Sequence, residues 1–281
     1  MSVVIEDRRI PGPHGEIPLR LYTPDSAPPT VNLVWAHGGA FAVGDLDMPE
    51  SDWVARQLAD RGIRVVAVDY RLAPVPRSLA VQLEGQHGGD TGSHYPVASE
   101  EVTAVFSWAV HAFGGTWALG GASAGADLAA GATLRLRDAG GRLPAGLLLA
   151  YPIVHAELPP LTAELAHQAA SLPGRSAFPP DTVLAMNLNY VRDPALLREP
   201  YAFPGGHDLT GLPPVFIVNS DADTLRASGQ QFAAELALAG TDVTVVREKG
   251  TQHGHLNLPD DPAATRSIAR MATWLLSPTL N

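Results

Sequence analysis

The chain has 281 residues, 46% of them hydrophobic, and a formal net charge of −10 at pH 7. This acidic balance argues against a nucleic-acid partner or an anionic membrane surface, since both attract Lys and Arg. The sequence contains no cysteine, which excludes disulfides, thiolate nucleophiles and cysteine-based metal sites.

A single domain over residues 1–281 fits this composition. The hydrophobic content is sufficient for a large core, and no Pro- or Ser-rich linker divides the chain. The N-terminal residues, MSVVIEDRRI, lack the basic and apolar segments of a secretory signal, and no stretch approaches the ~20 apolar residues of a membrane helix. We therefore expect a cytoplasmic protein without a membrane partner.

The chain begins with two stretches, 2–10 and 15–24, that predict an antiparallel hairpin at a sheet edge. Six further short runs are aliphatic or β-branched and bounded by turn residues: 31–37, 64–70, 117–123, 146–152, 214–220 and 242–248. Four of them are nearly continuous in apolar residues, as is typical of parallel strands covered on both faces. The total is eight strands.

Longer patterns with helical spacing lie between the apolar runs. They cover residues 50–62, 99–114, 124–140 and 226–240. In the second pattern, apolar residues recur every three or four positions, and all four patterns run into Gly, a common helix stop. The alternation predicts an α/β protein with an eight-stranded, mostly parallel sheet and helices on both faces.

Two segments do not fit this alternation. Residues 75–94 predict a loop insertion that ends in a Gly-rich polar run. Residues 155–212 are rich in Pro, with one short helical pattern at 181–191, and are long enough to form a lid over a site.

The stretch GASAG places Ser123 between a predicted strand and a predicted helix. A nucleophile at such a turn has a strained backbone, and Gly121 and Gly125 relieve the crowding around it. The helix N-terminus behind the serine also offers free N–H groups to an oxyanion. Taken alone the motif is weak, because an ordinary helix entrance in a Gly- and Ala-rich chain has the same pattern.

The stretch HGGAF, residues 37–41, strengthens this interpretation because it follows another buried strand. Its glycines leave amide N–H groups unobstructed, and these groups can form an oxyanion hole together with the amide of Ala124. The alternative for the two glycines is a tight turn without a catalytic role.

A serine nucleophile also needs a base and a carboxylate, which follow later in the chain. Asp221 and Asp223 end one predicted strand, and His253 and His255 follow the next strand by a short loop. Spacing alone does not choose between the two aspartates or between the two histidines.

With these motifs in place, the sequence resembles the hormone-sensitive-lipase group of α/β-hydrolases, in its bacterial esterase branch. The resemblance depends on HGGAF, DYRLAP (69–74), GASAG, DADTLRASG (221–229) and GTQHGH (250–255), which occur in the family's order. It implies an α/β-hydrolase fold and a serine carboxylesterase that needs no metal or cofactor and acts on a small-molecule ester through an acyl-enzyme.

Matched residue by residue, the resemblance assigns the nucleophile to Ser123, the acid to Asp223 and the base to His253. The oxyanion donors then fall on the amides of three residues, namely Gly38, Gly39 and Ala124. In DYRLAP, Asp69 and Arg71 are expected to support the oxyanion loop from below as structural residues.

The chain also departs from the family. Ala122 stands where an acidic residue usually precedes the serine, Ala40 replaces the third glycine of the oxyanion motif, and the N-terminal cap is largely missing. The reduced cap predicts an open, shallow site and therefore small or short-acyl esters. None of these departures affects the three triad positions.

Four residues are candidates for the substrate pocket, namely Phe41, His155, Met186 and Tyr190. The alternative for the last two is core packing of a lid helix, and His155 is equally well explained as a structural histidine. Two other functions remain open at this stage: the same triad acting on an amide, carbamate or lactone, and a non-catalytic ligand-binding receptor. The sequence also leaves open a homodimer, with its contact through the inserted loop or through the final helical pattern, 261–276.

Overall fold

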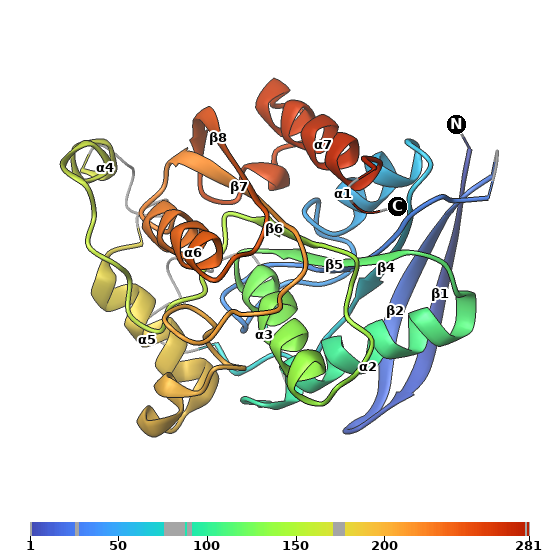
Figure 1. Ribbon diagram of the computed structural model, residues 1–281, viewed down its shortest axis with the longest axis horizontal. Coiled ribbons are helices and arrows are strands. Elements are labelled where there is room, and N and C mark those ends of the chain that lie inside the picture. Colours follow the sequence, from blue (N-terminus) through green and yellow to red (C-terminus); the bar gives the residue numbers. More distant parts are fainter. Residues whose placement is uncertain are drawn as a thin grey trace.

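The computed structural model describes residues 2–25, 28–75, 88, 92–170, 178–278 and 280. Its eight-stranded sheet has the order β1-β2-β4-β3-β5-β6-β7-β8 (Figure 1). The first hairpin and the β2–β4 pair are antiparallel, and all other pairs are parallel, as the sequence predicts. The strands are β1 Val3–Gly12, β2 Gly15–Pro24, β3 Asn32–Ala36, β4 Arg64–Val68, β5 Trp117–Ala122, β6 Leu147–Ala150, β7 Val215–Ala222 and β8 Val243–Gln252.

Helices cover both faces of the sheet and bury its central strands. Helices α1 (Asp52–Ala59) and α7 (Pro262–Leu275) lie on one face, and their apolar residues form one cluster with the strands. Helices α2 (Val97–Phe113), α3 (Ala124–Asp138) and α6 (Arg226–Leu238) cover the other face. Strands β3, β5 and β6 are buried along their whole length, which explains why their sequences lack a polar alternation.

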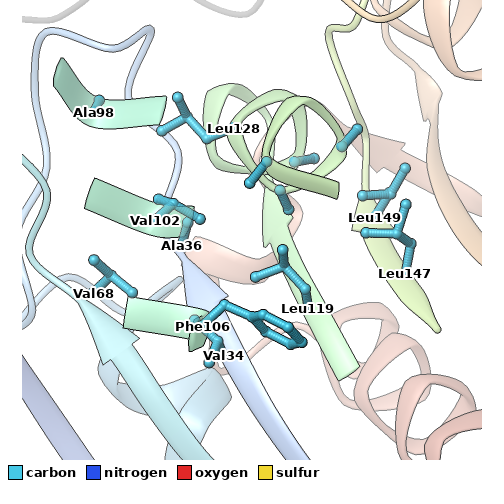
Figure 2. Packing of buried hydrophobic residues seen from close by; sticks show 14 of the residues in the cluster. Val34, Ala36, Val68, Ala98, Val102, Phe106, Leu119, Leu128, Leu147 and Leu149 are labelled. Carbon is cyan, nitrogen blue, oxygen red and sulfur yellow. The ribbon is translucent and has the colours of Figure 1, made fainter. Parts of the chain in front are cut away.

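The larger core cluster packs α2 and α3 against the middle of the sheet. Figure 2 shows Phe106 of α2 beside Val34 of β3, with Leu119 of β5 next to them and Val102 of α2 one turn away. All four side chains are at most 1% exposed. The packing holds β3 and β5 in register, and the two strands end at the same edge of the sheet.

The described residues of the lid segment contain two α-helices and a 3-10 helix: α4 Ala163–Ala169, α5 Pro180–Val191 and η2 Pro194–Arg198. Helix α5 coincides with the short helical pattern in the sequence. Most of the predicted insertion, 76–87 and 89–91, lies outside the described residues. Within the described ranges no helix has both the length and the hydropathy needed to cross a membrane.

Candidate active site

Ser123 lies at the turn between β5 and α3, at the carboxyl edge of the parallel strands. Its backbone has φ 52° and ψ −116°, a strained combination for a residue with a side chain. A Cβ on Gly125 would collide with the carbonyl oxygen of Ala36 in β3, and a Cβ on Gly121 would collide with the carbonyl oxygen of Gly125. The small residues of GASAG therefore allow a turn that larger side chains would block.

Ser123, His253 and Asp223 form a continuous chain of hydrogen bonds. The Oγ of Ser123 lies 2.9 Å from Nε2 of His253. On the other side of the ring, Nδ1 lies 2.8 Å from Oδ2 of Asp223. Ser123 is 4% exposed and Asp223 is fully buried. The arrangement has the geometry of a nucleophile, a base and an orienting carboxylate.

Asp221, the competing carboxylate, faces a different set of partners. It is ion-paired with Arg247 and Arg226 and accepts the N–H of Gly250 at 2.8 Å. Burial would raise the pKa of Asp221, but Gly250 and the two arginines together hold it below its ordinary value. Asp221 thus has a structural ion pair, and it is Asp223 that contacts the histidine.

His255, the competing base, is buried away from the serine. Its Nδ1 lies 2.9 Å from Oγ of Ser220, and its Nε2 lies 2.8 Å from Oγ of Ser267 in α7. Burial, aided by the nearby charge of His253, lowers the pKa of His255 to about 4. With both ring nitrogens bonded inside the protein, His255 joins β7 to α7.

The environment of His253 favours its protonated form. Burial would lower the pKa of His253, but the charge and hydrogen bond of Asp223 and the charge of Glu50 raise it above its ordinary value. Two aromatic rings meet the imidazole edge-on, those of Tyr151 and Phe178, each with its centroid 5.0 Å away. These contacts fix the orientation of the ring.

The oxyanion loop follows β3 and passes beside Ser123. Gly39 has φ 111°, and a Cβ there would collide with the carbonyl oxygen of Val43. Among the described residues, the N–H groups of Gly39 and Ala124 have no acceptor. The N–H of Gly38, by contrast, donates to Oε1 of Glu50 at 3.1 Å. The structure therefore argues against Gly38 as an oxyanion donor, because its N–H already has a partner inside the protein.

A family model described as alpha/beta hydrolase fold matches residues 33–82 and 92–257, most of the chain. The chain belongs to this α/β-hydrolase family. The matched segment includes the serine turn, the oxyanion loop and both strand ends that carry the acid and the histidine.

Curated esterases and solved esterase structures are similar to this hydrolase along nearly its whole length. Carboxylic ester hydrolase LipN of Mycobacterium tuberculosis is 34% identical, over 92% of this chain and 66% of the relative. Esterase LipI of the same species is 32% identical, over 95% and 79%. An esterase structure from Pyrobaculum calidifontis superposes with a TM-score of 0.82 at 28% identity, covering 99% of this chain and 87% of that one. The resemblance to bacterial esterases of the hormone-sensitive-lipase type is confirmed.

Three of the predicted pocket residues gather around the oxyanion loop of the hydrolase. Phe41 stacks on Tyr190 of α5 with ring centroids 3.9 Å apart. Met186, also on α5, is buried in a small cluster with Ala40 of the loop, and Phe178 packs against that cluster. Helix α5 thus covers the oxyanion loop, because its Tyr190 and Met186 side chains pack against residues of that loop.

His155, the fourth predicted pocket residue, fits its structural alternative. Its Nδ1 lies 2.8 Å from Oγ of Ser228, and its Nε2 lies 3.3 Å from a carboxylate oxygen of Glu235. Both nitrogens thus bind α6, and burial lowers the pKa of the ring despite the opposing charge of Glu235. His155 joins the end of β6 to α6.

Sequence reasoning missed two residues that hold the oxyanion loop. Tyr70, inside DYRLAP, stacks on His37 with centroids 4.5 Å apart and donates to the carbonyl oxygen of His37 at 2.8 Å. The second missed residue is Glu50, which accepts the N–H of Gly38; it lies in no motif, and no pattern in the sequence marked it.

Arg71, in the same DYRLAP stretch as Tyr70, is ion-paired with buried Glu101 of α2, in agreement with its predicted structural role.

Proposed function

We propose that the protein is a serine carboxylesterase with Ser123 as its nucleophile, His253 as its base and Asp223 as the orienting acid. The observation that carries the proposal is the unbroken hydrogen-bond chain from Ser123 through His253 to Asp223 at the carboxyl edge of the sheet. Three of the relatives are named for reactions on esters: carboxylic ester hydrolase LipN, carboxylesterase NlhH and an arylesterase of Saccharolobus solfataricus.

The reaction proceeds in two halves. His253 takes the proton of the Ser123 hydroxyl as the oxygen attacks the ester carbonyl, and Asp223 stabilises the imidazolium. The tetrahedral oxyanion receives hydrogen bonds from the amides of Gly39 and Ala124. The alcohol leaves with the proton from His253, and a water molecule activated by the same base then releases the acid and regenerates the serine.

We propose small or short-acyl esters as substrates. The support for this is the enclosure of the serine, which is 4% exposed, and the bulky side chains at the site. The ring of Phe178 is in edge contact with His253, and the stacked rings of Phe41 and Tyr190 cover the oxyanion loop. These walls leave little room for a long chain.

A series of p-nitrophenyl esters from acetate to palmitate tests both proposals. We expect kcat/KM to peak at the short acyl chains and to fall steeply at the long ones, with no turnover by Ser123→Ala. A peak at the long chains would contradict the substrate proposal only. Hydrolysis of amides or lactones with no ester turnover would move the activity to another acyl compound, and ligand binding without turnover would favour a receptor.

Location and assembly are predictions from the sequence. The cytoplasm is the expected compartment, and a homodimer contact through the inserted loop or through the final helix, α7, would be detected by size-exclusion chromatography with light scattering.

A further inference from the structure

Glu50 is a buried carboxylate beside the catalytic edge that the triad does not use. It precedes α1 in the loop after the oxyanion segment, and it is 2% exposed. A buried carboxylate is costly unless hydrogen bonds or charges compensate it. Its partners therefore indicate what it does.

Three groups donate hydrogen bonds to the carboxylate. The N–H of Gly38 reaches Oε1 at 3.1 Å, while the hydroxyl of Tyr151 and the side-chain amide of Asn257 reach Oε2 at 3.2 and 2.9 Å. All three are donors, so they favour the ionised form of Glu50. The backbone of Glu50 is fixed as well. Its N–H donates to Oδ1 of Asn257 at 3.0 Å, and its carbonyl oxygen accepts the indole N–H of Trp35 at 2.9 Å.

These partners belong to the two loops that must be aligned for the reaction. Gly38 begins the oxyanion loop, directly before the free amide of Gly39. Asn257 lies in the short helix η3, His255–Asn257, which follows His253 after a single glycine. The space is tight, since a Cβ on Gly38 would lie 2.6 Å from Oε1 of Glu50 and 3.1 Å from Cβ of Ser123.

We propose that Glu50 is a positioning residue for the esterase reaction: its carboxylate ties the oxyanion loop to the histidine loop, and its negative charge favours the imidazolium of His253. This inference depends on the proposed function and extends it to a fourth side chain. Glu50 does not touch the reacting atoms. It acts through Gly38, through Asn257, and through Tyr151, whose ring meets His253.

The charges of Glu50 and His253 are coupled. The groups that face His253 are Asp223, Glu50, His255 and Tyr151. Burial lowers the pKa of the imidazole, and the two carboxylates together raise it above its ordinary value. Burial raises the pKa of Glu50, and the charge of His253 is foremost among the effects that oppose it. Each group thus favours the charged form of the other.

The first test replaces Glu50 by Gln, which keeps the shape and removes the charge. We expect kcat on p-nitrophenyl acetate to fall about 10- to 100-fold with little change in KM, because the loops are misaligned in the transition state. The acid limb of kcat/KM should move to lower pH, since a negative charge near His253 is lost. Glu50→Asp, which retains the charge on a shorter side chain, should keep the acid limb near the wild-type position while kcat still falls.

Glu248→Gln is the matched control. Glu248 is also a buried carboxylate, 4% exposed, but it pairs with Arg266 and Arg270 of α7. We expect this variant to lower Tm without changing kcat or the pH profile. If Glu50→Gln fails to fold, Asn257→Ala cuts only the link between Glu50 and the histidine loop, and it should lower kcat with a smaller loss of Tm.

Two negative results have different meanings. A folded Glu50→Gln variant with wild-type kcat and a wild-type acid limb would overturn the role of Glu50 and leave the esterase intact. Wild-type protein that neither hydrolyses esters nor reacts with a fluorophosphonate at Ser123 would overturn the proposed function, and the role of Glu50 with it.

Discussion

At the scale of single residues, side chains of the same type differ in function because they have different partners. Asp221 and Asp223 are two residues apart, yet one binds arginines and the other binds His253. His253 and His255 are also two apart, and only the first reaches Ser123. The difference comes from where the chain leaves the extended conformation: Asp221 lies within β7 and Asp223 follows its end, and Gly254, with φ 73°, separates the two histidines.

Replacing Asp223 by Asn is expected to lower kcat by about 10⁴, because the histidine loses the carboxylate that fixes its tautomer and stabilises its charge. Asp221→Asn should leave kcat near the wild-type value and lower Tm instead, since it weakens the contacts with Arg247 and Gly250. Steady-state kinetics and thermal melts of the two variants check this. Equal losses of kcat would contradict the assignment of the acid.

The pH profile tests the state of His253. The base acts in its neutral form, and its pKa is raised by the charges of Asp223 and Glu50 in spite of burial. A raised pKa keeps the ring protonated to higher pH, so kcat/KM should already fall as the pH drops toward the unperturbed value of about 6.5. An acid limb with its midpoint below that of a free histidine would show that burial dominates.

Asp127, one turn along α3 from the serine, supplies a prediction for stability. It is fully buried, and neither carboxylate oxygen has a hydrogen-bond partner among the described residues. Burial raises its pKa well above the ordinary value. The stability that this group contributes is therefore complete below its unfolded pKa and is lost as the pH rises through the folded pKa.

Asp127→Asn should thus stabilise the protein at neutral pH, because the amide does not have to take up a proton when it is buried, and we expect a gain on the order of 1–3 kcal/mol. The gain in Tm, about 2–4 °C per kcal/mol for a chain of this size, should shrink toward pH 4. Asp260→Asn, which makes the same charge change at an exposed position, should give no such gain. A destabilised Asp127→Asn at pH 8 would show that the carboxylate has a partner in solution.

At the scale of elements, the lid segment places one aromatic side chain against the base. The carbonyl of Phe178, just before α5, accepts the hydroxyl of Thr224 at 2.7 Å, and the Phe178 ring meets His253 edge-on. Thr224 directly follows the acid Asp223, so the same contact ties the lid to the acid strand. The segment thus limits the space at the serine from a fixed position.

Phe178→Ala should widen the site. We expect the ratio of kcat/KM for p-nitrophenyl octanoate to that for the acetate to rise by about tenfold, the size of effect that a few methylenes have in an apolar pocket. Phe113→Ala at the end of α2, beside Arg64 at the start of β4, is the control at the opposite edge of the sheet. An unchanged ratio in Phe178→Ala would place the acyl chain elsewhere.

At the scale of the whole molecule, the sequence predicted the sheet well and the site in part. The strands were recognisable because central parallel strands such as β3 and β6 are continuously apolar, and the glycines around Ser123 marked the turn. The family resemblance, and not the spacing, selected Asp223 and His253. Residues two apart at one strand end have the same local pattern, and only the packed structure distinguishes them.

Glu50 and the state of Gly38 were not predictable, because they depend on contacts across the fold. Glu50 meets Asn257 from a position 207 residues away, and no local pattern encodes that distance. Gly38 occupies the sequence position expected of an oxyanion donor, but its N–H donates a hydrogen bond to Glu50.

The central claim is that Ser123 is an activated nucleophile, and labelling with a fluorophosphonate tests it most directly. The reagent should modify wild-type protein with one equivalent, and peptide mass mapping should place the adduct on Ser123. Ser123→Ala should remain unlabelled and folded. A well-folded wild-type protein that stays unlabelled, or that is labelled equally in the alanine variant, would contradict the account.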